Sequence, residues 1–265
     1  MSAPYGIALE FVGQPVEMMT QKTVQAAVVS GVSRGLGEAL AETLLARGFF
    51  VLGIGRVSSM KLSGKRYRFA ESDLAKPTLI AATVTPGLRE LAAREPTTVT
   101  LINNAAVATP AGVLGTLDAA ALESAIAVNV TAPLVLTDLF CRAFQSGSMA
   151  RRVINISSGA AQSAMAGSSA YCVSKAALEM LTKALVADHP GDSLQSIGLR
   201  PGIFETGMQA YLRGLNPAEF PSAPLFRSFK ANGLLKDPSD VAARIVDRLV
   251  RGPVEQGRIY THTDL

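Results

Sequence analysis

The chain has 265 residues, of which 48% are hydrophobic and 17% charged, a composition typical of a globular domain and not of a disordered chain. Its formal net charge of +4 is spread along the sequence without a lysine and arginine cluster, which argues against nucleic-acid binding and favours a small anionic ligand. Cys141, Cys172, His189 and His262 show no metal-ligand spacing, and no run of 18 apolar residues occurs, so we expect a cytoplasmic protein without metal or membrane segment.

The predicted elements begin after residues 1–22, which fit no motif and are assigned to an N-terminal extension or leader. Residues 23–265 read as one domain. Short apolar runs predict strands at 24–31, 49–56, 66–74, 97–105, 151–158, 194–202 and 257–263. Amphipathic stretches predict helices at 37–48, from about 77, at 118–146, at 170–188 and at 237–250, with 204–235 the least regular part.

The alternation of strands and helices predicts the fold class. Right-handed crossovers would place about seven parallel strands in one doubly wound sheet with helices on both faces, a single-domain Rossmann fold. Ligands of such α/β sheets bind outside the carboxyl ends of the strands. Residues that directly follow each strand are therefore the candidates for chemistry.

A glycine-rich turn, "SGVSRGLG", joins the first strand to the first helix. Gly31, Gly35 and Gly37 would let a phosphate approach the backbone at the helix N-terminus, with Ser33 and Leu36 in the same turn. The spacing differs from G-x-G-x-x-G, and glycine also serves plain turns. Its place between strand and helix favours a dinucleotide site.

Two arginines favour NADP(H) over NAD(H). Arg34 lies within the glycine turn, and Arg56 follows the second strand, where NAD-binding sheets carry an acidic residue for the ribose hydroxyl. A guanidinium suits a 2′-phosphate and supplies no acceptor for a free hydroxyl. Either arginine alone could be an ordinary surface charge.

Four segments in order, "SGVSRGLG", "INNAA", "NISS" and "YCVSK", resemble the short-chain dehydrogenase/reductases over roughly residues 24–262. Ser158 lies 13 residues before Tyr171, and Lys175 lies four residues after it, as in that family's active sites. Ala106 replaces the glycine of the family's Asn-Asn-Ala-Gly turn, a mild departure.

This resemblance implies the catalytic set Asn129, Ser158, Tyr171 and Lys175. Tyr171 would give a proton to a carbonyl oxygen that Ser158 also binds, and Lys175 would lower the phenol pKa and hold the nicotinamide ribose. Pro133 has no N–H, so the Asn129 carbonyl could hold a water for a proton relay, although Pro133 could also simply kink the helix. The resemblance also implies that Asp73 and Leu74 flank the adenine and that Asn103 and Ala105 line the cofactor cleft, with Asn104 as a further cofactor contact. Pro201, Gly202, Ile203 and Thr206 would meet the nicotinamide amide.

The substrate side is expected at 159–168 and 204–235, where Met165, Met208, Tyr211 and Leu212 would join Ser158 in a pocket for a small, fairly apolar ketone or diketone. These side chains could also simply cap the domain. "PGIFETGMQAYL" and "FKANGLLKDPSDVA" are similar to sepiapterin reductases and bacterial benzil reductases, but Thr261 stands where sepiapterin reductases carry a pterin-binding aspartate.

Alternatives remain open at this stage. A 3-oxoacyl or hydroxysteroid-type dehydrogenase is the second enzymatic reading, with Arg213, Arg227 and Lys230 available to an acyl carrier. A non-catalytic NADP(H)-responsive regulator would be expected to have a damaged catalytic set, which is intact here. The family resemblance also implies a homodimer or homotetramer.

Overall fold

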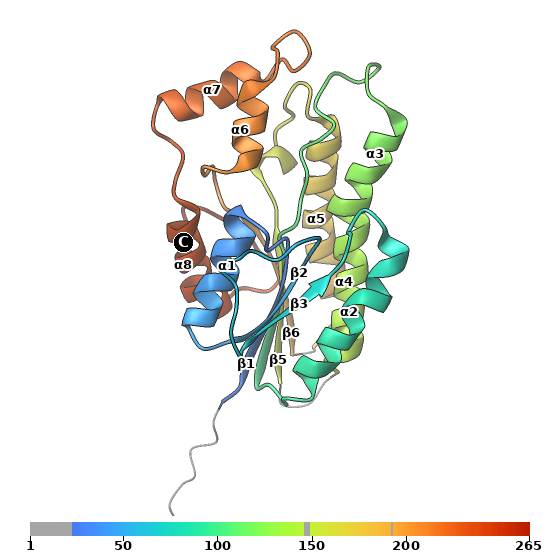
Figure 1. Cartoon of the computed structure of the whole chain (residues 1–265), viewed down its shortest axis with the longest axis vertical. Helices are drawn as coiled ribbons and strands as arrows, with labels where there is room; N and C mark the ends of the chain where they lie inside the picture. Colours follow the sequence, from blue (N-terminus) through green and yellow to red (C-terminus); the bar gives the residue numbers. More distant parts are fainter. Residues whose placement is uncertain (1–22, 146–148, 192) are drawn as a thin grey trace, which may run out of the picture.

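The computed structural model describes residues 23–145, 149–191 and 193–265, and its centre is one sheet of seven parallel strands (Figure 1). The predicted extension at 1–22 lies outside the described residues. Neighbouring strands follow the order β3-β2-β1-β4-β5-β6-β7, and every adjacent pair is parallel. The strands are β1 (Gln25–Ser30), β2 (Phe50–Gly55), β3 (Tyr67–Glu71), β4 (Thr98–Asn103), β5 (Ala150–Ile156), β6 (Leu194–Arg200) and β7 (Ile259–Thr261). The predicted doubly wound sheet is confirmed, and its switch point lies between β1 and β4.

Helices cover both faces of this sheet. On one face lie α1 (Gly35–Ala46) and α8 (Pro238–Ile245), which continues into a π-helical turn, η3 (Val246–Val250). On the other face lie α2 (Pro77–Ala92), α4 (Ala132–Ala143) and α5 (Ser169–Asp188). The helix predicted at 118–146 consists of α3 (Ala119–Ile126), a π-helical turn η1 (Ala127–Thr131) and α4. The remaining helices, α6 (Gly207–Gly214) and α7 (Ala223–Ala231), lie at the carboxyl edge of the sheet (Figure 1).

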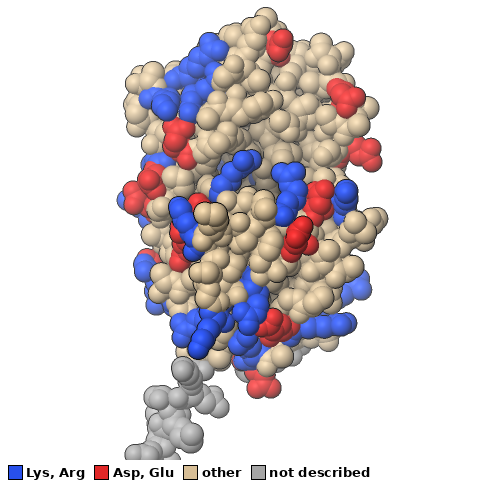
Figure 2. All heavy atoms as spheres, in the orientation of Figure 1, with Lys and Arg blue, Asp and Glu red and all other residues tan. Residues whose placement is uncertain are grey.

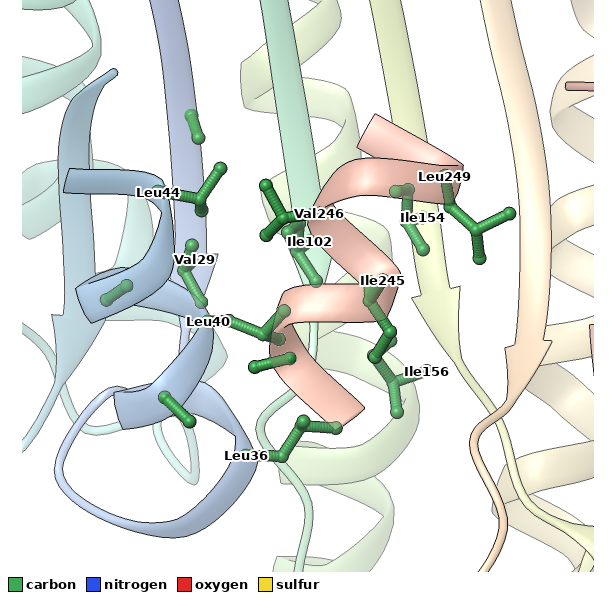
Figure 3. Packing of buried hydrophobic residues seen from close by; sticks show 14 of the residues in the cluster. Val29, Leu36, Leu40, Leu44, Ile102, Ile154, Ile156, Ile245, Val246 and Leu249 are labelled. Carbon is green, nitrogen blue, oxygen red and sulfur yellow. The ribbon is translucent and has the colours of Figure 1, made fainter. Parts of the chain in front are cut away.

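The central strands β1, β2 and β4 are buried on both sides because each face of the sheet carries its own core, whereas the edge strand β3 exposes Arg68 and Glu71. Val29 of β1 points into the cluster formed with α1 and α8, whose members Leu40, Leu44 and Ile245 are fully buried (Figure 3). Val28, one residue earlier, points into the opposite cluster with α2 and α4. The continuous apolar runs of the sequence are explained by this two-sided burial.

The stretch 204–235, which the sequence predicted to be the least regular part, contains two short helices. Thr206 ends the preceding segment in an extended conformation, and its hydroxyl accepts a hydrogen bond from the Gln209 N–H at 3.4 Å, which caps α6. Pro224 occupies the first turn of α7, where a missing N–H costs nothing. Both helices are short, so their amphipathic pattern was too brief to identify. We call α6, α7 and the residues between them the cap.

Candidate active site

The glycine-rich turn leaves the N-terminus of α1 open to a phosphate. Gly31 and Gly35 have φ angles of +79° and +63°, which side chains disfavour. A Cβ on Gly37 would lie 2.1 Å from the Gly31 carbonyl oxygen, so only glycine fits there. Ser33 is exposed in this turn, whereas the Leu36 side chain is buried in the core and can meet a cofactor only through its backbone. The cradle fits a dinucleotide diphosphate.

Asn104 supports this turn from the end of β4. Its Nδ2 donates to the Ser30 carbonyl at 2.9 Å, and its backbone N–H donates to the Ser30 hydroxyl at 3.0 Å. The Ala105 N–H donates to the same hydroxyl at 3.1 Å. The three bonds fix the loop after β4 against the loop after β1.

Asn103 requires a correction, because its side chain does not line the cofactor cleft. It is buried and turned between sheet and helices, where Nδ2 donates to Asn155 Oδ1 at 2.9 Å and to Thr137 Oγ1 at 3.1 Å. Asn155 Nδ2 in turn donates to Thr182 Oγ1 at 3.0 Å. This buried polar chain joins β4, β5, α4 and α5 beneath the site.

Arg34 and Arg56 are both exposed, the first at the N-cap of α1 and the second directly after β2. Figure 2 shows a hollow between the cap and the start of α1, with basic side chains at its rim. Glu38 of α1 accepts a short hydrogen bond from the Ser59 hydroxyl, and its other oxygen lies 3.5 Å from Lys61 Nζ. This carboxylate is therefore already occupied by protein groups.

The two predicted adenine contacts, Asp73 and Leu74, differ in what their side chains do. Asp73 Oδ1 accepts from the Ala75 N–H at 3.1 Å and fixes the turn after β3. The Leu74 side chain is buried in the cluster with α2, so it can meet an adenine only at its edge.

Ser158, Tyr171 and Lys175 meet at the carboxyl end of β5. The Ser158 hydroxyl accepts from the Ala160 N–H at 3.2 Å in a short 3₁₀ turn, η2 (Gly159–Ala161), and lies close enough to the Tyr171 phenol to lower its pKa. Tyr171 and Lys175 lie one turn apart on α5, with Lys175 Nζ 5.5 Å from the tyrosine ring centre. Lys175 Nζ donates to the Ile156 carbonyl at 2.8 Å. The spacing in the sequence thus brings the three predicted groups together.

Burial dominates the ionisation of this pair in the protein alone. Desolvation raises the pKa of Tyr171 to about 12, against the smaller lowering effect of the Ser158 hydrogen bond. Desolvation also lowers the pKa of Lys175 to about 8. These shifts belong to the protein alone, so the lowering of the phenol pKa that we expect from Lys175 with an oxidised nicotinamide beside it stays a prediction. Tyr171 stays protonated at neutral pH, which is the form that donates a proton, and Lys175 can exchange its proton near physiological pH.

Asn129 lies fully buried in the π-helical turn η1, close to the predicted helix irregularity at Pro133. Its Oδ1 accepts from the Val107 N–H and its Nδ2 donates to the Val107 carbonyl, both at 2.8 Å. Nδ2 also lies 3.1 Å from the Ser174 hydroxyl of α5. Asn129 therefore ties the loop after β4 to the helix of Tyr171, and the proton relay through its carbonyl stays a prediction.

The loop after β6 returns to the glycine turn. Pro201 is buried, Gly202 has a φ of +84° and Ile203 is half-buried. The Thr206 methyl group lies 3.3 Å from the position that a Cβ on Gly35 would occupy. The glycine turn and the loop after β6, both assigned to the cofactor, are thus neighbours in space.

The predicted substrate residues separate by their burial. Met165 and Met208 are half-buried and pack against the apolar cluster of the cap. Leu212 is 4% exposed inside that cluster with Phe220, so it is a packing residue and not a lining residue. Tyr211 is 44% exposed on the same helix, and its contact with substrate stays a prediction.

An ion pair below the catalytic groups was missed by the sequence reasoning. Glu179 of α5 pairs with Arg200, the last residue of β6, and both side chains are largely buried. The signal was available, since Tyr171, Lys175 and Glu179 recur at intervals of four on one helical face. Among the residues that the structure describes, no group of three His, Cys, Asp or Glu side chains could hold a metal ion.

Known proteins match this arrangement. The family model for short chain dehydrogenases matches residues 25–215. A benzil reductase ((S)-benzoin forming) from Bacillus subtilis is 33% identical over 235 residues, covering 88% of this chain and 96% of that protein. Sepiapterin reductase from Mus musculus is 32% identical over 250 residues, covering 87% and 93%.

Solved structures agree. A short chain dehydrogenase from Burkholderia cenocepacia in complex with NADP has a TM-score of 0.72 and 28% identity, covering 90% of this chain and 96% of that one. A 3-oxoacyl-(acyl-carrier protein) reductase from Brucella melitensis in complex with NAD has a TM-score of 0.74 and 25% identity, covering 91% and 96%. With the glycine cradle and the serine, tyrosine and lysine set in place, the chain belongs to the short-chain dehydrogenase family of nicotinamide-dependent oxidoreductases.

Proposed function

We propose that the protein reduces a small, fairly apolar ketone or diketone with NADPH. The observation that carries this proposal is the meeting of Ser158, Tyr171 and Lys175 at the end of β5, below an apolar cap. The benzil reductase similarity, which extends over 88% of the chain, supports the same substrate class.

The chain's own residues would hold the carbonyl and supply its proton. When bound, the reduced cofactor supplies the hydride that adds to the carbonyl carbon. The Ser158 hydroxyl would hydrogen-bond the carbonyl oxygen, and the Tyr171 hydroxyl would protonate it as negative charge develops. Lys175, with its pKa near 8, would return a proton to Tyr171 and bind the ribose hydroxyls of the cofactor. Because burial raises the pKa of Tyr171, the phenol would keep its proton until negative charge develops on the substrate oxygen.

The preference for NADPH rests on charge at two positions. Arg34 and Arg56 are exposed beside the glycine turn and after β2, and residue 56 is not an acid that could accept from a ribose hydroxyl. Two guanidinium groups can each make charge-assisted hydrogen bonds to a 2′-phosphate. The NADP complex of the Burkholderia cenocepacia relative supports this choice, while the NAD complex of the Brucella melitensis relative makes it a choice worth testing.

We also propose that the protein is a cytoplasmic homo-oligomer that pairs through α4 and α5. Leu134, Val173 and Met180 on these helices are 48%, 62% and 63% exposed, an apolar surface suited to a second copy.

The helix Ala119–Ala143 is, by length and composition alone, apolar enough to cross a membrane. Its residues Leu136 and Phe140 pack in the core, which identifies it as a helix of the domain.

The decisive experiment follows loss of the reduced-nicotinamide absorbance with benzil, isatin, sepiapterin and an acetoacetyl thioester, with NADPH and NADH in parallel. We expect the fastest turnover with a diketone and NADPH, and none with Tyr171→Phe. A preference for NADH would refute the roles of the two arginines. Tight NADPH binding without turnover of any carbonyl would favour the regulatory alternative.

A further inference from the structure

A buried ion pair lies one helical turn below Lys175. Arg200 donates to Glu179 through both Nε and Nη2, each at 2.7 Å from a different carboxylate oxygen. The Ser157 hydroxyl donates to Glu179 Oε1 at 2.7 Å. The two charged side chains are only 16% and 14% exposed. A bidentate pair with a third donor has little rotational freedom, so its geometry is fixed. We call these three residues the clasp.

Each member of the clasp lies close to a group of the active site, two of them as direct neighbours in the sequence. Ser157 directly precedes Ser158, and Arg200 directly precedes Pro201. Glu179 lies on the same face of α5 as Tyr171 and Lys175. The clasp therefore connects the end of β5, the end of β6 and the helix that carries the proton donor.

Two other hydrogen bonds join parts of the same elements. The Ser157 N–H donates to the Leu199 carbonyl at 2.7 Å as part of the sheet, and Lys175 Nζ donates to the Ile156 carbonyl at 2.8 Å. Between α5 and the end of β6, the two hydrogen bonds from Arg200 to Glu179 form a bidentate link of fixed geometry. Without them, α5 could shift against the strand ends that hold Ser158 and Pro201.

The clasp acts through position more than through charge. Arg200 neutralises Glu179, so the pair presents no net charge to Lys175 one turn away. The lowered pKa of Lys175 comes from burial. A neutral, rigid link under the site can set distances between reacting groups, and misplacement of such groups by about 1 Å can cost about a hundredfold in rate.

We propose that Glu179 and Arg200, with Ser157, are positioning residues. They keep Tyr171, Ser158 and the loop after β6, which begins at Pro201, in fixed positions relative to one another. This inference deepens the proposed function and rests on it, because the reaction positioned is the carbonyl reduction. The clasp itself does not touch the reacting atoms in this scheme.

The first test compares Glu179→Gln, Arg200→Gln and the double variant with the wild type. The matched control is Asp247→Asn. Asp247 accepts two hydrogen bonds from the Arg47 guanidinium, at 3.0 and 2.9 Å, at the C-terminal end of α1. Assays with benzil and NADPH are run well below each melting temperature. We expect roughly a tenfold to hundredfold lower kcat in all three clasp variants and a change below about twofold in the control.

The double variant separates position from stability. Removing both charges avoids an unpaired buried ion, so its melting temperature should recover relative to the single variants. If the clasp positions the site, kcat stays low although stability recovers. Recovery of kcat together with the melting temperature would overturn the proposal, as would wild-type kcat in folded Glu179→Gln.

A second readout needs no substrate. Carbon-13 labelling of lysine side chains lets NMR follow the titration of Lys175, identified by the signal lost in Lys175→Met. In the double variant the net charge beside Lys175 is unchanged, so a loosened α5 should admit water and move the midpoint upward from about 8. An unmoved midpoint would overturn the proposal. If the wild type reduces no carbonyl, the proposed function fails while this titration still decides whether the clasp fixes α5.

Discussion

Lys175 is expected to destabilise the fold that it serves. Its side chain is 2% exposed, and a charged ammonium there has lost nearly all its water. We predict that Lys175→Met abolishes carbonyl reduction and yet raises the free energy of unfolding near neutral pH. Methionine has similar length and no charge to desolvate.

The magnitude follows from the pKa of Lys175. Its ordinary value of 10.5 falls to about 8 on folding, and each pKa unit corresponds to about 1.4 kcal/mol, so burial of the charged lysine costs about 3 kcal/mol at pH 7. Lys175→Met removes this cost. Methionine cannot donate to the Ile156 carbonyl, however, and the loss of that hydrogen bond costs about 1–3 kcal/mol. The expected net stabilisation at pH 7 is therefore small, about 1 kcal/mol.

The pH dependence gives the sharper test. Between pH 8 and 10.5 the unfolded chain binds a proton at Lys175 that the folded chain has lost, so wild-type stability rises with pH in that window. The raised pKa of Tyr171 opposes this only above about pH 10, and it is present in both proteins. The free energy of unfolding of Lys175→Met minus that of the wild type should therefore fall by about 2–3 kcal/mol between pH 7 and pH 10.

Urea unfolding at the two pH values measures this gap. Lys183→Met is the matched control, because Lys183 lies on the same helix and is exposed. Its gap to the wild type should not change with pH. A constant gap for Lys175→Met between pH 7 and pH 10 would refute the argument that burial lowers the pKa of this lysine.

Three further predictions concern the cradle, the cofactor and the buried polar chain. Gly37→Ala places a Cβ 2.1 Å from the Gly31 carbonyl oxygen and should weaken NADPH binding at least about tenfold, measured by quenching or enhancement of nicotinamide fluorescence; unchanged affinity would show that the turn does not bind the diphosphate. Arg56→Ser should lower NADPH affinity roughly tenfold to hundredfold and leave NADH affinity nearly unchanged, and equal losses for both cofactors would contradict a 2′-phosphate contact. Asn155→Ala leaves the amide of Asn103 with one partner fewer in a buried site and should cost about 2–4 kcal/mol in urea unfolding, whereas a cost below about 0.5 kcal/mol would mean that water replaces the missing group.

Much of the fold could be predicted from the sequence, because strands buried on both sides are continuous apolar runs. The run 24–31 contains β1, and the spacing of Tyr171 from Lys175 placed both on one face of α5. The cap helices were missed since each has fewer than ten residues and starts from a single cap or proline.

Side-chain direction explains most of the remaining errors. Asn103 follows the strand pattern to the edge of β4, yet its amide turns inward because Asn155 stands beside it on β5. That neighbour is 52 residues away in the chain, so only the strand register reveals it. The clasp was only half visible in the same way: the spacing of four places Glu179 on the face of α5 that carries Tyr171 and Lys175, but its partner Arg200 is 21 residues away and no local pattern joins the two. For Tyr171, the spacing shows the nearby charge of Lys175 but does not show the burial that raises the phenol pKa in the protein alone.

The cap has a small apolar core of its own. The rings of Phe220 and Phe226 pack in a tilted arrangement with their centroids 5.7 Å apart. Leu212 belongs to the same cluster, which is separate from the two clusters that flank the sheet. It is joined to the strands through the residues after β6, where Phe204 bridges to Lys236. Substitutions in the cap can therefore change this small core without changing the packing of the sheet. If the cap binds the substrate, as we propose, substrate specificity can change there while the proton donor stays in place.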